Sequence, residues 1–369
     1  MTKRQNIINT ILSFVLTIGA IILIILCGKT SALMIKNVAL FLAGAIVFGL
    51  INAFMHELGH LIFGRLNGFA FSSLTVWFFN WTRVSPKKIK FSFCGIGNEA
   101  GYTEMIPKTA ENVEKRTANL SLGGIIFSFI MMVLSLLPFI FQNKIKLEPY
   151  LFLSISFPIS VYYFFGNLLP MINEGVRNDG ATYFGIKKKT DSMQVAINIS
   201  KIHAHLYQGK SPSEIDQALY FYVPQLPEDD LNFIMLLDLR YEYYLDAGDT
   251  DNAVKTLNRL LTLEDYMPKY IRYKVKTDAL YNSCFLKKNE NDADDLMDEL
   301  DKFLNKNNTP QTLRAKMAYL IYIVKDLENI ETFYNKALRE IDKIYIEGVK
   351  KYEEKQLNNL TKDVLEVVE

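Results

Sequence analysis

The sequence predicts an all-α polytopic membrane domain over residues 1–189, with about four transmembrane helices and a short membrane-associated β-hairpin. A soluble α-helical domain is predicted over residues 190–369. Three observations support this class. Four uncharged apolar stretches in the first part are each near the length of about 20 residues that a helix needs to cross a bilayer. The first part has 18 Lys/Arg and 8 Asp/Glu, whereas the second has 23 and 32. The second part is also amphipathic, which is typical of helices that pack in water.

The four apolar stretches are the expected transmembrane helices. The first covers residues 7–27; it is too long and too uniformly apolar for a signal peptide, and no small-residue cleavage site follows it. The second covers residues 37–55 and continues into the sequence HELGH, and the third covers residues 117–141. The fourth covers residues 149–173 and contains Pro158, which a membrane helix tolerates when neighbouring groups satisfy the freed carbonyl.

The basic residues between these stretches predict how the chain crosses the cell membrane. Lys and Arg concentrate near the N-terminus, between the second and third stretches, and after the fourth. Because basic segments tend to stay in the cytoplasm, both termini, the middle segment and the C-terminal domain are expected there. HELGH then lies toward the cytoplasmic end of the second helix, and the fourth helix ends on the same side.

The segment between the second and third helices is aromatic and β-prone. Residues 69–81 read FAFSSLTVWFFNW and residues 88–97 read KIKFSFCGIG, so we expect two strands with a turn near residues 85–86. Trp77 and Trp81 suit a hairpin that dips into the membrane interface, where tryptophan is enriched. The alternative is a plain cytoplasmic hairpin, or an irregular loop, with exposed aromatic side chains.

The C-terminal domain contains a pattern that resembles tetratricopeptide repeats. Residues 241–265 predict a helix, a short AGD turn and a second helix with Ala253 at a packing position. Looser echoes occur at residues 281–300 and 320–338, with a spacing of about 40 residues where the standard repeat has about 34. The alternative is a helical bundle without repeats.

The cysteines carry no recognisable chemistry. Cys27, Cys94 and Cys284 are far apart and odd in number, so they form neither a disulfide framework nor a paired-cysteine metal site. We interpret all three as ordinary packing residues.

The sequence HELGH raises a chemical question, because ionisable side chains are costly in an apolar span. His56 and His60 are four residues apart, so a helix puts them on one face, where both rings can bind one zinc ion. Glu57 can lie beside the metal and take a proton from a zinc-bound water, whose pKa falls to about 7. The alternative is that HELGH is a solvated helix end just outside the bilayer.

A catalytic zinc usually has three protein ligands and an open position. The other histidines, His203 and His205, fall in the C-terminal domain and are interpreted as surface residues, so the third ligand is expected to be a carboxylate. Asp179 and Glu174 are the candidates, because both lie in GNLLPMINEGVRNDG, where the fourth span ends on the same side of the membrane as HELGH.

These residues resemble the site-2 proteases, a family of zinc-dependent intramembrane proteases. In that family a later span carries an Asn-x-x-Pro…Asp-Gly motif that supplies the third zinc ligand; Asn167, Pro170, Asp179 and Gly180 match its parts. The resemblance therefore implies that Asp179 is this ligand. The gap between Pro170 and Asp179 is longer than is usual in the family, which keeps Glu174 open as the alternative.

Two further motifs add to the resemblance, which covers roughly residues 37–180. AGYTEM at residues 100–105 is similar to the family's Gly-Tyr-containing strand that lies along the substrate, so this segment is expected to hold an unwound substrate by β-augmentation. LGGIIFS at residues 122–128 has a Gly124-x-x-x-Ser128 spacing like that of the family's small-residue motif.

The resemblance implies a zinc metalloendopeptidase that cleaves a membrane-spanning protein or peptide within or near the bilayer. Zn²⁺ is expected on His56, His60 and Asp179, with Glu57 as the general base. The expected partners are the lipid bilayer, the substrate, and a protein or peptide bound by the C-terminal helices; no nucleic-acid partner is expected. The alternative is a membrane-anchored, noncatalytic binding module whose helical tail recognises a cytosolic protein or peptide.

Overall fold

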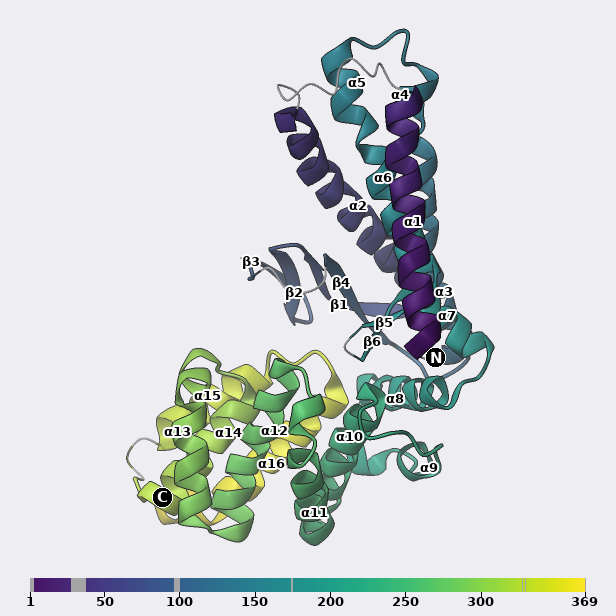
Figure 1. The fold of residues 1–369 in the computed structure, drawn as a ribbon. Helices are drawn as coiled ribbons and strands as arrows, with labels where there is room; N and C mark the ends of the chain where they lie inside the picture. Colours follow the sequence, from purple (N-terminus) through teal and green to yellow (C-terminus); the bar gives the residue numbers. More distant parts are fainter. Residues whose placement is uncertain are drawn as a thin grey trace. The chain divides into compact units, whose positions relative to one another are not determined.

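The computed structural model describes residues 3–27, 38–95, 100–173, 175–326, 328 and 330–368. Contacts within the chain divide it into two compact units. The first comprises residues 1–83, 89–106 and 112–193, and the second comprises residues 84–88, 107–111 and 194–369. The colours of Figure 1 follow the chain from the purple helix α1 of the first unit to the yellow C-terminal helix of the second.

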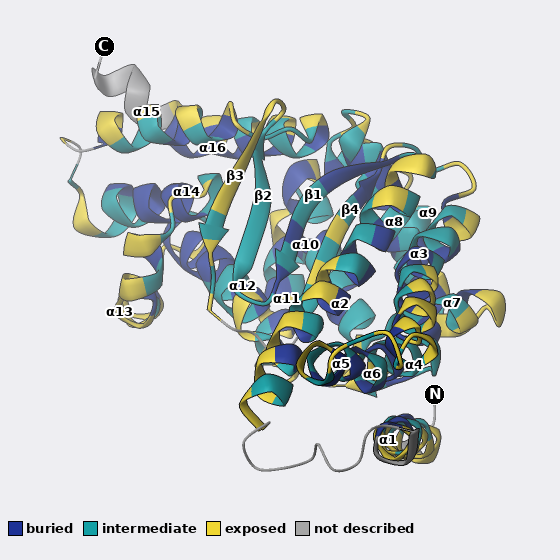
Figure 2. Cartoon of the chain, turned by 90° about the horizontal axis from the view of Figure 1, so that it is seen from above, coloured by how far each residue is buried: buried dark blue, intermediate teal, exposed yellow. Residues whose placement is uncertain are grey.

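Among its described residues, the first unit contains four helical segments that are long and apolar enough to cross a membrane. They are α1 (Lys3–Cys27), α2 (Val38–Leu66), α3 (Val113–Leu134) with α4 (Leu137–Ile140), and α5 (Leu147–Ser154) with α6 (Ser156–Leu168). The predicted class of four apolar helices and a helical C-terminal region is confirmed. Large apolar side chains stay exposed along α1, α2 and α3, coloured yellow in Figure 2, as expected for a surface that meets lipid.

Glycines let α2 and α3 pack backbone to backbone. Gly59 on α2 faces Gly123 on α3, and a methyl group on either residue would overlap the other helix. Small residues are common where membrane helices approach closely, because lipid provides little hydrophobic drive for association. This crossing brings the residues after Gly123 against the histidine face of α2.

The fourth apolar stretch is two helices and not one. α5 ends at Ser154, α6 begins at Ser156, and Pro158 lies in the first turn of α6. Proline has no N–H, so the Ser154 carbonyl loses the donor that a continuous helix would provide. The break therefore follows from the proline that the predicted span contains.

A small sheet follows α2 in the order β3-β2-β1-β4. Its strands are β1 (Phe69–Val76), β2 (Phe79–Ser85), β3 (Lys88–Phe93) and β4 (Gly101–Pro107). The turn predicted near residues 85–86 is confirmed, but the single strand predicted over residues 69–81 was wrong. The chain reverses at residues 77–78, and β1 pairs with β2 antiparallel from Val76↔Phe79 onward. Residues 96–97 of the second predicted strand lie outside the described residues.

Tertiary packing explains the unexpected turn. Trp77 has a left-handed backbone (φ 54°), a conformation that glycine or asparagine usually supplies in tight hairpins. Its ring lies against Gly49 of α2, where a Cβ atom would be 3.0 Å from the indole. The turn is therefore stabilised by burial of the indole, which the local sequence does not reveal.

After α6 the chain forms a two-stranded hairpin and a short helix. β5 (Ile172–Asn173) pairs with β6 (Val176–Arg177), and α7 (Asp179–Lys187) follows. Gly175 has a left-handed backbone (φ 82°) at the hairpin turn. The long gap before Asp179 is therefore occupied by a hairpin.

The second unit is built mainly from helices. They are α8 (Asp191–Tyr207), which begins in the first unit, α9 (Ala218–Phe221), α10 (Leu231–Ala247), α11 (Thr250–Leu261), α12 (Lys269–Tyr281), α13 (Glu290–Lys306), α14 (Pro310–Tyr319), α15 (Ile330–Ile341) and α16 (Glu347–Val368). Short 3₁₀ turns cover Pro212–Glu214 and Glu264–Tyr266, and π-helical turns over Asn282–Lys287 and Leu320–Val324 extend α12 and α14.

Successive helix pairs occupy residues 231–341 of this unit. α10 and α11 turn at Gly248 (φ 78°), and Asp249 caps α11, as expected from the helix–turn–helix pattern of residues 241–265. The pairs α12–α13 and α14–α15 turn at Lys288 (φ 52°) and Lys325 (φ 61°), each after a π-helical turn. The left-handed turn residues recur at intervals of about 40 residues.

A buried ion network also connects the helices of the second unit. Arg314 of α14 is 2% exposed and lies 3.5 Å from Asp278 of α12 and 3.0 Å from Glu353 of α16. Its guanidinium stacks over the rings of Tyr281 and Tyr352. Buried charges are tolerated when they are paired, so this network fixes α12, α14 and α16 against one another.

Candidate metal centre

Helix α2 buries the three ionisable residues of HELGH. His56, Glu57 and His60 are 4–8% exposed, although the rest of the helix up to Gly64 carries no charge. The two imidazoles lie on one face of the helix, with their Nε2 atoms 3.2 Å apart. Their burial argues against the alternative of a solvated helix end.

A carboxylate from α7 completes the group. Asp179 is the first residue of α7, and its Oδ2 lies 3.0 Å from His56 Nε2 and 3.2 Å from His60 Nε2. Among the described residues, this trio is the group of His, Cys, Asp and Glu side chains that could hold a metal ion. The structure thus brings together the three residues named as ligands from the sequence.

The hydrogen bonds of the histidines determine where their lone pairs point. His60 Nδ1 lies 2.9 Å from the Leu120 carbonyl oxygen, which can only accept, so Nδ1 carries the proton. His56 Nδ1 lies 2.9 Å from Ser128 Oγ on α3. Ser128 Oγ can accept from His56 Nδ1 in the same way, and with both Nδ1 atoms protonated each neutral ring turns an Nε2 lone pair toward the other ring. Both lone pairs also face Asp179 Oδ2, a buried atom with no hydrogen-bond donor among the described residues.

Converging lone pairs repel one another unless a cation lies between them. Zinc bonds imidazole nitrogen and carboxylate oxygen at about 2.0–2.2 Å, which suits a triangle with edges of 3.0–3.2 Å. Two histidines and an ionised carboxylate therefore fit a zinc ion and leave one of its four positions for water or substrate.

Helix α3 gives the histidines both space and a hydrogen bond. A Cβ atom at Gly124 would lie 2.6 Å from the Cε1 atoms of both imidazole rings, so glycine lets α3 pass this close. Ser128, one turn further along α3, contacts His56 Nδ1. The two small residues singled out in LGGIIFS therefore both adjoin the candidate ligands.

Strand β4 holds Glu57. Thr103 Oγ1 donates a hydrogen bond of 2.7 Å to Glu57 Oε2. A Cβ atom at Gly101 would lie 2.5 Å from Glu57 Oε1, so the glycine leaves room for the carboxylate. From the sequence, Thr103 was expected only in the strand that holds the substrate, and its contact with Glu57 was not predicted. Thr103 is two residues from Gly101, so both lie on one face of a strand. This spacing alone did not predict the contact with Glu57, because the contact also requires β4 to lie against α2.

Asn178 shapes the turn that presents Asp179. Its Oδ1 accepts from Ala181 N (2.9 Å), which caps α7, and from Met171 N (3.0 Å). Its Nδ2 donates to two carbonyl oxygens at the end of α6, both at 2.7 Å. Sequence reasoning also missed this residue. The signal was an asparagine directly before a helix, because asparagine is a preferred N-cap.

The other predicted residues play different parts. A Cβ atom at Gly180 would overlap the backbone at the end of α6, so this glycine lets α7 abut α6. Asn167 instead donates to the Tyr163 carbonyl one turn earlier in α6. Glu174, the alternative third ligand, lies outside the described residues. His203 and His205 lie on α8, in the part that belongs to the second unit.

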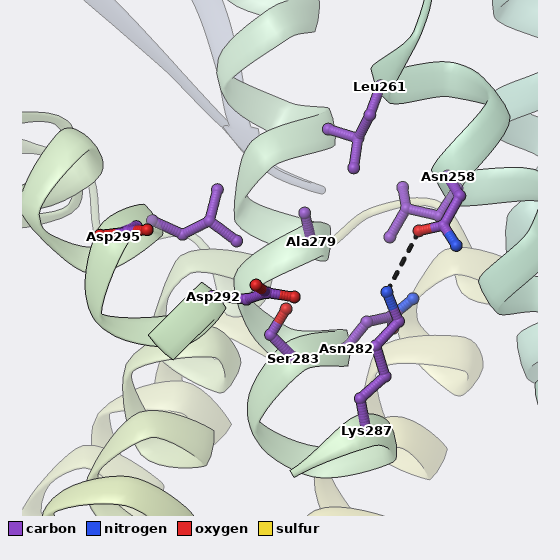
Figure 3. Close-up of a pocket in the computed structure, with 10 residues that line it drawn as sticks. Asn258, Leu261, Ala279, Asn282, Ser283, Lys287, Asp292 and Asp295 are labelled. Carbon is purple, nitrogen blue, oxygen red and sulfur yellow. Dashed lines mark hydrogen bonds between the residues drawn. The ribbon is translucent and has the colours of Figure 1, made fainter. Parts of the chain in front are cut away.

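The second unit contains a cavity of about 290 Å³ between α11, α12 and α13 (Figure 3). Leucine and alanine side chains form part of its lining, and Asp292 and Asp295 lie on its α13 side. Lys287 donates a hydrogen bond of 3.2 Å to Asn258, drawn as a dashed line in Figure 3. Asn282 is 2% exposed, and its Nδ2 lacks a partner among the described residues.

No protein-family model matches this chain. No curated protein and no solved structure matches it either. The functional interpretation therefore depends on the geometry of the metal centre and on the motifs that form it.

Proposed function

We propose that this protein is a zinc-dependent intramembrane endopeptidase similar to the site-2 proteases. One observation carries the proposal: the lone pairs of His56, His60 and Asp179 converge in a buried site without a hydrogen-bond donor between them. Glu57 lies next to this group and bonds to Thr103. Two histidines and a carboxylate suit a catalytic zinc, and a carboxylate outside the ligand set suits a general base.

The chain's own residues divide the chemical work. His56, His60 and Asp179 hold the zinc ion, which when bound lowers the pKa of water to about 7 and polarises the scissile carbonyl. Thr103 occupies Glu57 Oε2, so Oε1 is the atom that takes the proton of the attacking water. Gly101 keeps the space beside Oε1 free of a side chain. The proton then passes from Glu57 to the leaving amine.

The substrate is a membrane-spanning protein or peptide that unwinds to expose its backbone. β4 is an edge strand of the sheet, so a substrate segment can add to it by β-augmentation. The same strand contacts the base through Thr103. Substrate backbone and general base are therefore aligned by one element.

The protein acts in the cell membrane, with both termini and the C-terminal helices in the cytoplasm. The four apolar helical segments and the distribution of Lys and Arg support this placement. The successive helix pairs support a tetratricopeptide-like tail that binds a protein or peptide.

A membrane-anchored, noncatalytic binding module is the second candidate. The observation that favours it is the cavity in Figure 3, whose lining combines apolar side chains with Asn282, Asp292 and Asp295, as in a pocket that binds a polar ligand. In this alternative the metal site is vestigial. The complete ligand set and the adjacent Glu57 favour the enzyme.

The test combines metal content with cleavage. Wild-type protein in detergent should contain about one zinc ion per chain, and His60→Ala and Asp179→Ala should lose it. Glu57→Gln should keep zinc but cleave co-expressed single-span membrane proteins about 10²–10⁴-fold more slowly. Glu114→Gln is the matched control, because Glu114 is an exposed carboxylate in the first turn of α3 and belongs to neither the metal centre nor the substrate strand.

The outcomes separate the two candidates. Absence of zinc from the wild type after supplementation contradicts the enzyme. If cells that carry Glu57→Gln in place of the wild type show no loss of the protein's function, the binding module is supported, because that role needs no general base.

A further inference from the structure

Helix α1 carries a polar stripe on an otherwise apolar surface. Each of Asn6, Asn9, Thr10, Ser13 and Thr17 has another member of this set three or four residues away, so they share one side of the helix. The other faces carry apolar side chains that are 42–57% exposed, namely Ile7, Ile8, Ile11, Leu12, Phe14, Val15 and Ile18. Polar side chains in membrane helices usually bond to neighbouring elements. The stripe therefore marks the face by which α1 attaches to the rest of the unit.

The two asparagines bond to a backbone segment far along the chain. Asn6 makes a two-way contact with Ile172, because its Nδ2 donates to the Ile172 carbonyl at 2.7 Å and its Oδ1 accepts from Ile172 N at 2.8 Å. Asn9 Nδ2 donates to the Pro170 carbonyl at 2.6 Å. Thr10 bonds the Asn6 carbonyl and also lies 3.4 Å from Met171 Sδ in the same segment, whereas Thr17 bonds the Ser13 carbonyl within α1.

The segment held by α1 leads directly to the third candidate ligand. Ile172 belongs to β5 and pairs with Arg177 of β6, two residues before Asp179. Met171, between the two clamped residues, bonds Asn178 in both directions, through its N–H (3.0 Å) and its carbonyl (3.1 Å). Asp179 is thus connected to α1 through a short series of hydrogen bonds.

We infer that Asn6 and Asn9 are positioning residues of the metal centre, which clamp residues 170–172 so that Asp179 Oδ2 meets the two histidines. This inference rests on the proposed function. Asn178 ties the start of α7 to the end of α6, and the bonds from α1 hold the intervening residues 170–172, so that both sets of outer groups orient the ligand. Helix α1 therefore positions the zinc site, although it supplies no ligand.

A purely structural role for α1 predicts something different. α1 also packs on α6, where Phe14 contacts Tyr162, and it buries Ser13, Ala20 and Ile24. If the asparagines served only this packing, their loss would lower stability without changing the affinity of the folded protein for zinc. Zinc affinity and the ligand field of the metal therefore separate the two roles.

The experiment uses full-length protein purified in detergent and stripped of metal. Zinc affinity is measured by competition with a chromophoric chelator, and cobalt(II) is added separately to record its visible absorption spectrum. The double variant Asn6→Ala/Asn9→Ala should bind zinc about tenfold more weakly, at the lower end of the 10–100-fold effects of outer-shell changes. Its cobalt spectrum should also change. Thr17→Ala, on the same helix face, should match the wild type.

The single variants keep the test decisive if the double variant aggregates. Asn6→Ala removes two of the three bonds and should weaken zinc binding more than Asn9→Ala, which removes one. Wild-type zinc affinity and an unchanged cobalt spectrum in these variants overturn the inference, as does an equal loss in Thr17→Ala. A wild-type protein that binds no zinc overturns the proposed function itself, which is a distinguishable result.

Discussion

The two units each bury a polar cluster, and the clusters differ in how they are satisfied. In the candidate metal centre of the first unit, two imidazole nitrogens and a carboxylate oxygen face one another at 3.0–3.2 Å, and no other side chain in the described part of the chain donates to that oxygen. In the second unit, Arg314 lies between Asp278 and Glu353, so positive and negative charges alternate. Both clusters consist of ionisable side chains in apolar surroundings. The difference teaches that composition and burial do not distinguish a binding site from a structural network.

Chemical complementarity does distinguish them. A buried group remains stable when each charge faces its opposite, so the Arg314 network is complete as it stands. The candidate metal centre has no such cation among its own two neutral imidazoles and its carboxylate, and under the proposed function a bound zinc ion supplies the positive charge. The following predictions test this contrast, from the largest expected effect to the smallest.

Removing Arg314 should cause the largest loss of stability. Arg314→Ala leaves Asp278 and Glu353 buried without their cation and should lower the free energy of unfolding by about 3–5 kcal/mol. Both tryptophans lie in the first unit, so their fluorescence is an internal control for a melt followed by circular dichroism. Zinc content should stay at the wild-type level.

The control for this prediction is an exposed ion pair. Lys343 forms an ion pair with Glu340, and the Lys343 side chain is 52% exposed. Because exposed ion pairs contribute about 1 kcal/mol or less to the free energy of unfolding, Lys343→Ala should have little effect. Equal melting of Arg314→Ala and Lys343→Ala would show that the network contributes little.

A methyl group at Gly124 should affect the other cluster. In Gly124→Ala the new Cβ atom overlaps both imidazole rings, so zinc affinity should fall by about 10–100-fold, as for other changes that misplace ligands. Gly19→Ala is the matched control, because a Cβ atom there meets nothing within 4 Å. Zinc competition measures both variants, and wild-type affinity in Gly124→Ala would contradict the assigned site.

The pH dependence of stability should show the smallest effect. Burial raises the pKa of Asp278 to about 7, although Arg314 and Lys274 lower it. The unfolded chain has a lower value of about 3.9, so between these values the folded protein binds a proton that the unfolded chain does not. This contribution to stability is therefore present at low pH and is lost as pH rises through 7. From pH 7 to pH 6, the free energy of unfolding should rise by about 1 kcal/mol on account of this residue.

Asp278→Asn should remove this slope, because the amide does not titrate. Melts at several pH values measure it, with Asp342→Asn as the control, since Asp342 is 74% exposed. An unchanged slope in Asp278→Asn would assign the pH dependence to other groups.

Local sequence patterns predicted much of the fold. Long apolar runs predict membrane-type helices because burial in lipid depends on the composition of one continuous segment. The spacing of His56 and His60 predicts a shared face because that geometry is intrinsic to the helix. The AGD turn between α10 and α11 could be predicted because its determinants are local: Gly248 adopts the left-handed backbone conformation and Asp249 caps α11.

Local patterns failed where packing overrides local preference. The chain reversal at Trp77 depends on packing of its ring against Gly49 of α2. No glycine or asparagine at this position indicates a turn. The roles of Thr103, Asn178 and Asn6 likewise depend on which segments meet in space. Each of these residues contacts a partner that is far away in the sequence, so the periodicity of one helix or strand does not reveal the contact.

The sequence by itself determined the apolar helices, the histidine pair and the carboxylates able to join it, because each follows from composition or from the period of one element. Only the tertiary structure decided that α7 presents Asp179 to both rings, that β4 holds Glu57 and that α1 clamps the loop between α6 and α7. The physical reason is that hydrogen bonds and close packing between distant segments depend on the positions of whole elements. Those positions are set by the sum of many contacts and not by any single motif.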